Sequence, residues 1–240
     1  MITFADKMDL ITQYADGKVS KKHLYSFITG EDVVSNTKIT SAIERAAKLR
    51  ANKIKDRHLQ VLYIAGESGS GKTTAAKYFA ENKLHYDYFV TGSGEDFLDG
   101  YDKEECLILD DWRAGSMKFS EVLKMLDNNT NSSVRSRYNN KDLSNCKLII
   151  ITSIKKPTDL YQMLQEEGSE EPAEQFYRRL LHHYFVVEKE GDRLIKEYSL
   201  NMKSLGCPTG RTLGSMNTIY KELNIDPNKC DDDFILEDCV

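Results

Sequence analysis

One octapeptide, Gly-Glu-Ser-Gly-Ser-Gly-Lys-Thr at residues 66–73, constrains the fold of this chain more than any other feature. It fits the pattern G-x-x-x-x-G-K-[ST] of a loop that binds phosphate groups. An apolar run at residues 61–65 precedes it and a helical pattern at residues 73–81 follows, as this motif requires. The glycines let consecutive backbone N–H groups turn towards an anion, and the helix N-terminus adds a partial positive charge. These residues predict a site for a nucleoside triphosphate.

The polar residues of the loop have separate chemical tasks. Lys72 is expected to reach the β- and γ-phosphates, and the Thr73 hydroxyl is expected to bind Mg²⁺. The residues expected to contact the nucleotide are Gly66, Gly69, Ser70, Gly71, Lys72, Thr73 and Thr74. A glycine-rich turn before a helix is the alternative interpretation, but it does not require every fixed residue of the pattern.

A pair of acids follows a second apolar run, at residues 107–109. Binding sites of parallel sheets lie at the carboxyl ends of the strands, so Asp110 and Asp111 are expected beside the phosphate loop. We expect Asp110 to hold Mg²⁺ and Asp111 to polarise the attacking water as a general base. The two acids could instead cap the next helix. A small-molecule kinase does not require the second acid, whereas a hydrolysing ATPase does.

Apolar runs that alternate with helical patterns indicate the fold class. They lie at residues 59–65, 86–90, 106–109 and 148–152. Strands that alternate with helices form a mostly parallel sheet with crossover helices. We therefore expect an α/β fold of the P-loop additional-strand (AAA+-like) ATPase class. Residues 184–188 and 193–200 flank Glu190-Gly191-Asp192, a turn sequence that predicts a β-hairpin.

The sequence divides into three parts. Residues 1–57 are expected to form a small helical N-terminal segment, residues 58–200 the ATPase domain, and residues 201–240 an acidic appendage that is partly disordered. The last part has weak periodicity and two prolines. Within the first part, helices are expected at residues 8–14, 21–27 and 40–51, separated by Gly17, Gly30 and Asp32.

Composition and charge exclude several classes of protein. Of the 240 residues, 40% are hydrophobic and 30% are charged, as in globular proteins. The longest aliphatic run, residues 148–151, is too short for a transmembrane helix, and the N-terminal sequence does not resemble a secretory signal. The net charge is −5, and residues 221–240, with seven acids and two bases, account for all of it. The acidic balance therefore does not argue against a polyanionic partner.

Five cysteines form an odd set without C-x-x-C spacing: Cys106, Cys146, Cys207, Cys230 and Cys239. This usage is typical of reduced thiols in a cytosolic protein rather than of a disulfide framework or a zinc site. We therefore expect a cytoplasmic protein.

Basic residues in two further segments are candidates for contact with phosphate groups. Between residues 128 and 145, basic side chains beside an aromatic ring would suit a finger that grips a nucleic-acid backbone, although a solvated loop has a similar composition. The candidates there are Arg135, Arg137, Tyr138 and Lys141. Arg178 and Arg179 follow on a helix expected to start near Pro172. Such a pair is usually a surface feature, but in a ring ATPase it can reach the neighbouring subunit's nucleotide as arginine fingers.

Together these segments resemble the superfamily 3 helicase domain of rolling-circle replication initiators, the Rep proteins of small circular single-stranded DNA viruses and related bacterial plasmids. The resemblance covers residues 58–190 and rests on Gly66–Thr73, Phe97–Asp102, Leu107–Trp112, Leu123–Asp127, the basic segment, Ile149–Ser153 and Phe176–Leu180. It implies that residues 1–57 are a helical oligomerisation segment. It also implies a hexameric ring that hydrolyses ATP with Mg²⁺ between subunits and moves 3′ to 5′ on single-stranded DNA. It also implies that Arg137 and its neighbours track the strand, and that a virus of a eukaryote would use the protein in the host nucleus.

Two departures from the family pattern are expected to matter. His182 and His183 are adjacent and lie beyond the ATPase core, so they do not fit the His-hydrophobic-His metal motif of the family's nicking endonuclease. We therefore expect no nicking activity in this chain, which is either a stand-alone helicase or a fragment without an upstream endonuclease domain. Ile154 stands where the family has an asparagine that senses the γ-phosphate. Either Thr152 or Ser153 then takes over as sensor, or hydrolysis is weak.

Several interpretations of function stay open beside the preferred DNA helicase. A small-molecule P-loop kinase would explain the phosphate loop, but not the paired acids or the basic segment. A non-helicase ring ATPase would share every motif except the purpose of the basic segment. An ATP-gated oligomerisation module without turnover would explain Ile154. RNA is an alternative strand, and the Rep-like spacing favours DNA.

Overall fold

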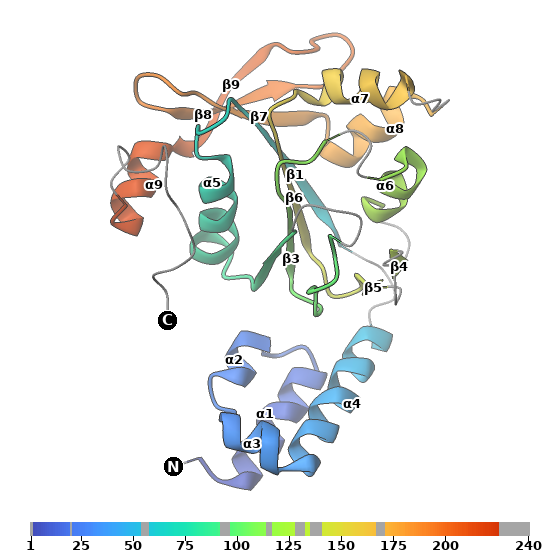
Figure 1. Ribbon diagram of the computed structural model, residues 1–240, viewed down its shortest axis with the longest axis vertical. Coiled ribbons are helices and arrows are strands. Elements are labelled where there is room, and N and C mark those ends of the chain that lie inside the picture. The colour runs from blue at the N-terminus through green and yellow to red at the C-terminus, as the bar shows by residue number, and fades with distance from the viewer. Residues whose placement is uncertain are drawn as a thin grey trace.

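The computed structural model describes residues 2–19, 21–53, 58–91, 97–113, 117–127, 133–134, 141–166 and 171–225. Four N-terminal helices form one group, and a β-sheet flanked by helices forms most of the remainder (Figure 1). The α/β fold expected from the alternating apolar runs is therefore confirmed. No helix in the described part of the chain is both long and apolar enough to cross a membrane.

The main sheet has seven strands in the order β2-β3-β6-β1-β7-β8-β9. The first five are parallel to one another, and β8 and β9 continue the sheet in antiparallel pairing. Its strands are β1 (Gln60–Ala65), β2 (Tyr88–Val90), β3 (Cys106–Leu109), β6 (Leu148–Ser153), β7 (His183–Val187), β8 (Leu194–Ser199) and β9 (Pro208–Ser215). β7 and β8 form the expected hairpin. Two short strands, β4 (Ser133–Val134) and β5 (Lys141–Asp142), pair separately with each other.

Helices cover both faces of the main sheet. One face carries α5 (Lys72–Tyr78), the π-helical turn η1 (Phe79–Lys83) and α9 (Met216–Leu223). The other face carries α6 (Phe119–Met125), α7 (Pro157–Glu166), α8 (Ala173–Tyr177) and the 3₁₀ turn η2 (Arg178–Leu180) (Figure 1). Alternate residues of β3 enter the two cores, Leu107 and Leu109 on the α6 side and Ile108 on the α5 side. Because β3 and β6 are buried on both faces, their sequences are continuous apolar runs.

The N-terminal helices pack around a small core of their own. They are α1 (Phe4–Ala15), α2 (Lys21–Tyr25), α3 (Gly30–Ser35) and α4 (Thr37–Lys53). The predicted interruption at Gly30 and Asp32 is wrong, because α3 begins at Gly30. Thr29 and Asp32 form a capping box in which each side chain accepts a hydrogen bond from the other residue's backbone N–H. A helix start of this kind satisfies backbone donors that would otherwise lack partners.

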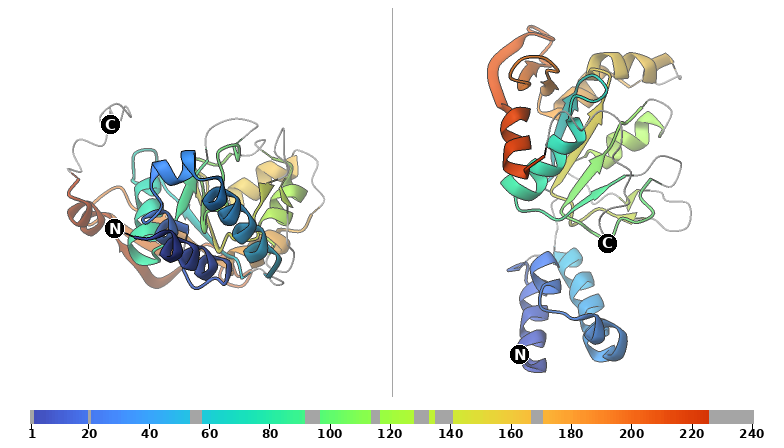
Figure 2. Two further views of the ribbon diagram at one scale, coloured as in Figure 1. Left: turned by 90° about the horizontal axis from the view of Figure 1, so that it is seen from below. Right: turned by 60° about the vertical axis from the view of Figure 1, so that its left-hand side comes forward.

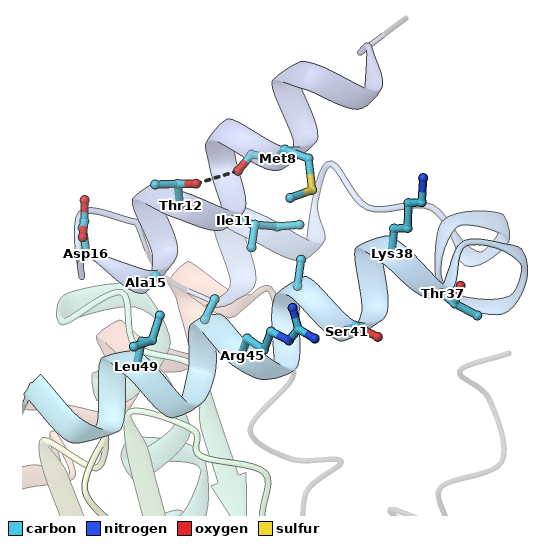
Figure 3. A pocket seen from close by; sticks show the side chains of 12 residues that line it. Met8, Ile11, Thr12, Ala15, Asp16, Thr37, Lys38, Ser41, Arg45 and Leu49 are labelled. Carbon is cyan, nitrogen blue, oxygen red and sulfur yellow. Dashed lines mark hydrogen bonds between the residues drawn. The ribbon is translucent and has the colours of Figure 1, made fainter.

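A groove of about 630 Å³ runs between α1 and α4 (Figure 3). Met8 and Ile11 of α1 and Leu49 of α4 supply apolar side chains, whereas Lys38 and Arg45 of α4 supply positive charge. Leu49 is 55% exposed, so α4 presents an apolar side chain to the surface at this groove. Isolated exposed leucines are common, but here the leucine continues a concave apolar surface.

A buried ionic network joins the N-terminal helices to the sheet. Arg50 of α4 is 8% exposed. Its guanidinium donates to the carbonyl oxygens of Tyr14 at 3.3 Å and Val19 at 2.7 Å, and lies 3.9 Å from the carboxylate of Glu105. Glu105 directly precedes β3 and also pairs with Lys147, before β6, at 2.6 Å. Because buried charges need partners, these contacts fix α4 against the amino ends of two central strands.

Residues 208–223 are part of the sheet and its helical layer, which corrects the appendage expected over residues 201–240. β9 has mostly exposed side chains, and main-chain pairing with β8 places it at the edge of the sheet. α9 then lies beside α5, as the right-hand view of Figure 2 shows. An edge strand without an apolar face leaves no periodic signal in the sequence. Residues 226–240 lie outside the described part.

Candidate nucleotide-binding site

The phosphate loop connects β1 to α5 at the carboxyl ends of the parallel strands. Its backbone is tightly folded, because a Cβ atom on Gly66 would lie 2.7 Å from Ser70 Oγ and 3.1 Å from the carbonyl oxygen of Val187. Gly71, the N-cap of α5, has φ of 93°, a conformation that favours glycine. The Ser70 hydroxyl is buried and has no hydrogen-bond partner among the described residues. A phosphate oxygen would satisfy this otherwise costly buried group.

Lys72 begins α5 and lies over the loop. Its Nζ atom donates to the carbonyl oxygen of Glu67 at 2.7 Å, and the residue is 9% exposed. Burial lowers the pKa of Lys72, while the negative charges of Asp111 and Asp110 act in the opposite direction. A polyphosphate bound to the loop would interact with this buried ammonium group, which lies close to two carboxylates.

Asp110 connects the phosphate loop to the ends of two strands, through its carboxylate to β6 and through its backbone N–H to the residue after β2. Its Oδ1 atom accepts hydrogen bonds from Thr73 Oγ1 at 2.6 Å and from Thr152 Oγ1 at 2.8 Å. The backbone N–H of Asp110 donates to Thr91 Oγ1, after β2, at 3.1 Å. Hydroxyl and carboxylate oxygens are suitable ligands for Mg²⁺, so the donor set fits the metal expected with a nucleotide.

Asp111 lies next to this cluster in a left-handed backbone conformation, with φ of 44°. Its N–H donates to Thr152 Oγ1 at 2.9 Å, so one hydroxyl contacts both acids. Its carboxylate accepts a hydrogen bond from Arg113 Nε at 3.1 Å and forms an ion pair with the same guanidinium. In this arrangement the carboxylate expected to act as general base is paired with a cation.

Comparison with known proteins agrees with this geometry. Residues 62–155, which contain the loop, the acid pair and β6, match the family described as RNA helicase. The chain is also 41% identical over 156 residues to a replication protein of Onion yellows phytoplasma (strain OY-M). That match covers 64% of this chain, and the chain spans about 40% of the length of the relative. Residues 62–155 therefore resemble a helicase domain, and the longer match resembles part of a replication protein.

The hydroxyl groups at the end of β6 have partners that the sequence did not predict. Thr152 is bonded to the two acids, and Ser153 Oγ donates to the carbonyl oxygen of Trp112 at 2.9 Å and accepts from the N–H of Lys155 at 3.2 Å. Neither hydroxyl can replace the family's asparagine without giving up these bonds. Ile154 is 49% exposed and lines a cavity of about 700 Å³ beside the first two loop residues.

The structure separates the two arginines proposed as fingers. Arg179 Nε donates to the carbonyl oxygen of Leu123 at 2.8 Å, and its guanidinium also reaches the carbonyl oxygen of Gln175 and the carboxylate of Asp127. Burial lowers the pKa of Arg179, and the charge of Asp127 opposes this shift. The Arg179 side chain is therefore engaged within its own chain, which favours a structural role over the proposed arginine finger. Arg178 is exposed and remains the single candidate of the pair.

The proposed nucleic-acid residues are only partly covered by the structure. Arg135, Arg137 and Tyr138 lie outside the described residues. Lys141 begins β5, where it stands opposite Val134 of β4. Because β4 and β5 pair with each other, Val134 and Lys141, which flank residues 135–140, lie side by side.

Two groups of contacts at the site were not predicted from the sequence. One is the bridge from Thr152 to both acids, which depends on the register of β6 against β3. The other is the contact of α9 with Gly71, where Met216 and Tyr220 lie against the loop. The only sequence signal for this second contact is the helical spacing of the apolar residues in α9, and a helix of eight residues gives only a short periodic pattern.

Replacing Arg179 should test its structural assignment. We expect Arg179→Ala to lower the free energy of unfolding by about 2 kcal/mol, because it removes the guanidinium donor from two partly buried carbonyl groups. Arg178→Ala, the matched control on an exposed neighbour, should change it by less than about 0.5 kcal/mol. Urea unfolding measures both values. Equal losses in the two variants would contradict the assignment.

Proposed function

We propose that this chain is the ATP-dependent DNA helicase part of a rolling-circle Rep protein. It would hydrolyse ATP with Mg²⁺ between subunits of a homo-hexameric ring and move on single-stranded DNA, in the 3′ to 5′ direction that the family resemblance implies. The observation that carries the proposal is the Asp110 carboxylate, which is bonded to the loop residue Thr73 and to Thr152 of β6. This links a nucleotide site to the strand end where hydrolysis is controlled in such ATPases.

The described residues divide the chemistry between them. Lys72 and the unpaired Ser70 hydroxyl would bind the phosphates, together with the backbone of the loop. Thr73 and Asp110 would hold Mg²⁺, which when bound supplies positive charge to the phosphate oxygens. Asp111 would orient and deprotonate the attacking water. For this step its carboxylate must leave the ion pair with Arg113.

Nucleic acid is the proposed partner of the segment between β4 and β5. Arg135, Arg137, Tyr138 and Lys141 combine cations with an aromatic ring, which suits a single strand with exposed phosphates and unstacked bases. We infer DNA as the strand because the phytoplasma relative is a replication protein, whereas the description of the matching family, RNA helicase, would favour RNA. We place the protein in the cytoplasm, or in the host nucleus for a virus of a eukaryote. A nicking endonuclease would belong to a region outside this sequence.

The groove between α1 and α4 is the surface that we assign to contact between subunits. It combines an exposed leucine, Leu49, with apolar residues of α1, on a group of helices held to the sheet by the buried Arg50. This connection would hold the surface that contacts the next subunit at a fixed position relative to the nucleotide site. The adjacent Lys48 is exposed and does not line the groove, which makes it a suitable reference position.

The subunit contact can be tested by placing a charge in the groove. We expect Leu49→Glu to convert the ring to smaller species, because a carboxylate would lose hydration at an apolar contact. Lys48→Glu introduces the same side chain outside the groove and should leave the ring intact. Size-exclusion chromatography with light scattering reports the mass of each. An unchanged mass for Leu49→Glu would remove the groove from the subunit contact.

A second candidate function is an ATP-gated oligomerisation module. Ile154 favours it, because an aliphatic side chain cannot bind the γ-phosphate and both neighbouring hydroxyls have other partners. A non-helicase ring ATPase is the remaining alternative. The three functions differ in whether ATP is hydrolysed and in whether DNA stimulates hydrolysis.

Steady-state ATP hydrolysis with and without single-stranded DNA tests the proposal. We expect turnover that DNA stimulates and that Lys72→Ala lowers by at least about a hundredfold, since the main phosphate cation is lost. Lys77→Ala, an exposed lysine of the same helix, is the matched control and should retain turnover. ATP binding without turnover would favour the oligomerisation module. Turnover that ignores DNA would favour the non-helicase ATPase.

A further inference from the structure

The C-terminal helix α9 contacts the phosphate loop at Gly71. A Cβ atom on Gly71 would lie 2.5 Å from Tyr220 Oη and 2.6 Å from Met216 Cε. Both distances are shorter than real Cβ contacts, so these two side chains pack directly against the backbone of the loop. Met216 is fully buried and Tyr220 is 2% exposed. Side chains of α9 therefore cover one side of the loop backbone.

Contacts at both ends hold α9 in this position. At its start, the N–H of Met216 donates to the carbonyl oxygen of Arg193 at 3.0 Å, and Ser215 Oγ donates to the carbonyl oxygen of Asp192 at 2.6 Å. Near its end, Glu222 is bonded to the Tyr78 hydroxyl of α5 and lies 3.7 Å from Lys83 Nζ. The helix is thus attached to the β7–β8 turn at one end and to α5 and η1 at the other.

Gly71 is the position at which movement of the loop would matter most. It is the N-cap of α5, and the backbone N–H groups that follow it point to the place where a phosphate would bind. Its φ of 93° lies in the left-handed region, which glycine adopts readily because it has no Cβ atom. A loop that must present several N–H groups to an anion binds better when its geometry is fixed before the anion arrives.

We propose that Met216 and Tyr220 are positioning residues for the phosphate loop, and that α9 holds Gly71 in the conformation that binds the polyphosphate of ATP. The inference rests on the proposed function. Because both side chains are buried, they act through the loop backbone and do not contact the nucleotide. In this proposal α9 affects the binding of the phosphate chain. The nucleotide base should therefore not change the effect of a substitution in α9.

Equilibrium binding by the full chain tests this role with conservative variants. Tyr220→Phe removes the hydroxyl that packs on Gly71, and Met216→Leu withdraws the terminal methyl group. We expect each to raise the Kd for fluorescent ATP about three- to tenfold. The Kd for inorganic tripolyphosphate, measured by competition, should rise by the same factor. Ile219→Val, a core change in the same helix away from the nearest contacts to Gly71, is the matched control and should leave both values unchanged.

Thermal unfolding of the three variants separates positioning from general loss of stability. The proposal requires weaker phosphate binding in Tyr220→Phe and Met216→Leu than in Ile219→Val at comparable Tm. Unchanged Kd values, or losses that follow Tm in all three variants, would overturn it while ATP binding by the natural sequence would still support the proposed function. Weaker binding of ATP but not of tripolyphosphate would overturn it in favour of a contact with the base. A natural chain that binds neither ligand would overturn both proposals.

Discussion

The shared hydrogen bonds of the Asp110 carboxylate are the interaction on which the candidate site depends. Thr73 reaches Asp110 from the phosphate loop, and Thr152 reaches it from β6, so three segments meet at one oxygen atom. The same Thr152 hydroxyl accepts the N–H of Asp111. A buried polar cluster is stable only when its members have partners. The order of the central strands is therefore what brings the nucleotide loop, the acid pair and the β6 end together.

The sequence was most informative where chemistry or burial leaves few choices. The glycines and Lys72 of the loop identify a phosphate site by residue type, and the strand before the acids is apolar because both faces are covered. These signals were enough to predict the parallel sheet and the expected neighbours Asp110 and Thr73. The family resemblance gave the same assignment, and residues 62–155 match a family described as RNA helicase.

Other features depend on contacts that residue type does not specify. Arg178 and Arg179 are identical in sequence terms, and only the carbonyl groups of Leu123 and Gln175 distinguish the structural arginine from the exposed one. β9 is held by main-chain pairing, so its exposed side chains carry no pattern. Without β9, the position of α9 against Gly71 could not be foreseen. The roles of these polar side chains and the position of the edge strand therefore become clear only from the contacts in the folded structure.

The most direct measurement of the central claim is calorimetric titration of ATP into the full chain with and without Mg²⁺, for the natural sequence and for Asp110→Asn. If Asp110 and Thr73 hold the metal that accompanies the nucleotide, Mg²⁺ should strengthen ATP binding in the natural sequence, and Asp110→Asn should lose that gain while it still binds ATP weakly. An Asp110→Asn variant whose binding responds to Mg²⁺ as the natural chain does would show that the metal is bound elsewhere, and would contradict the account.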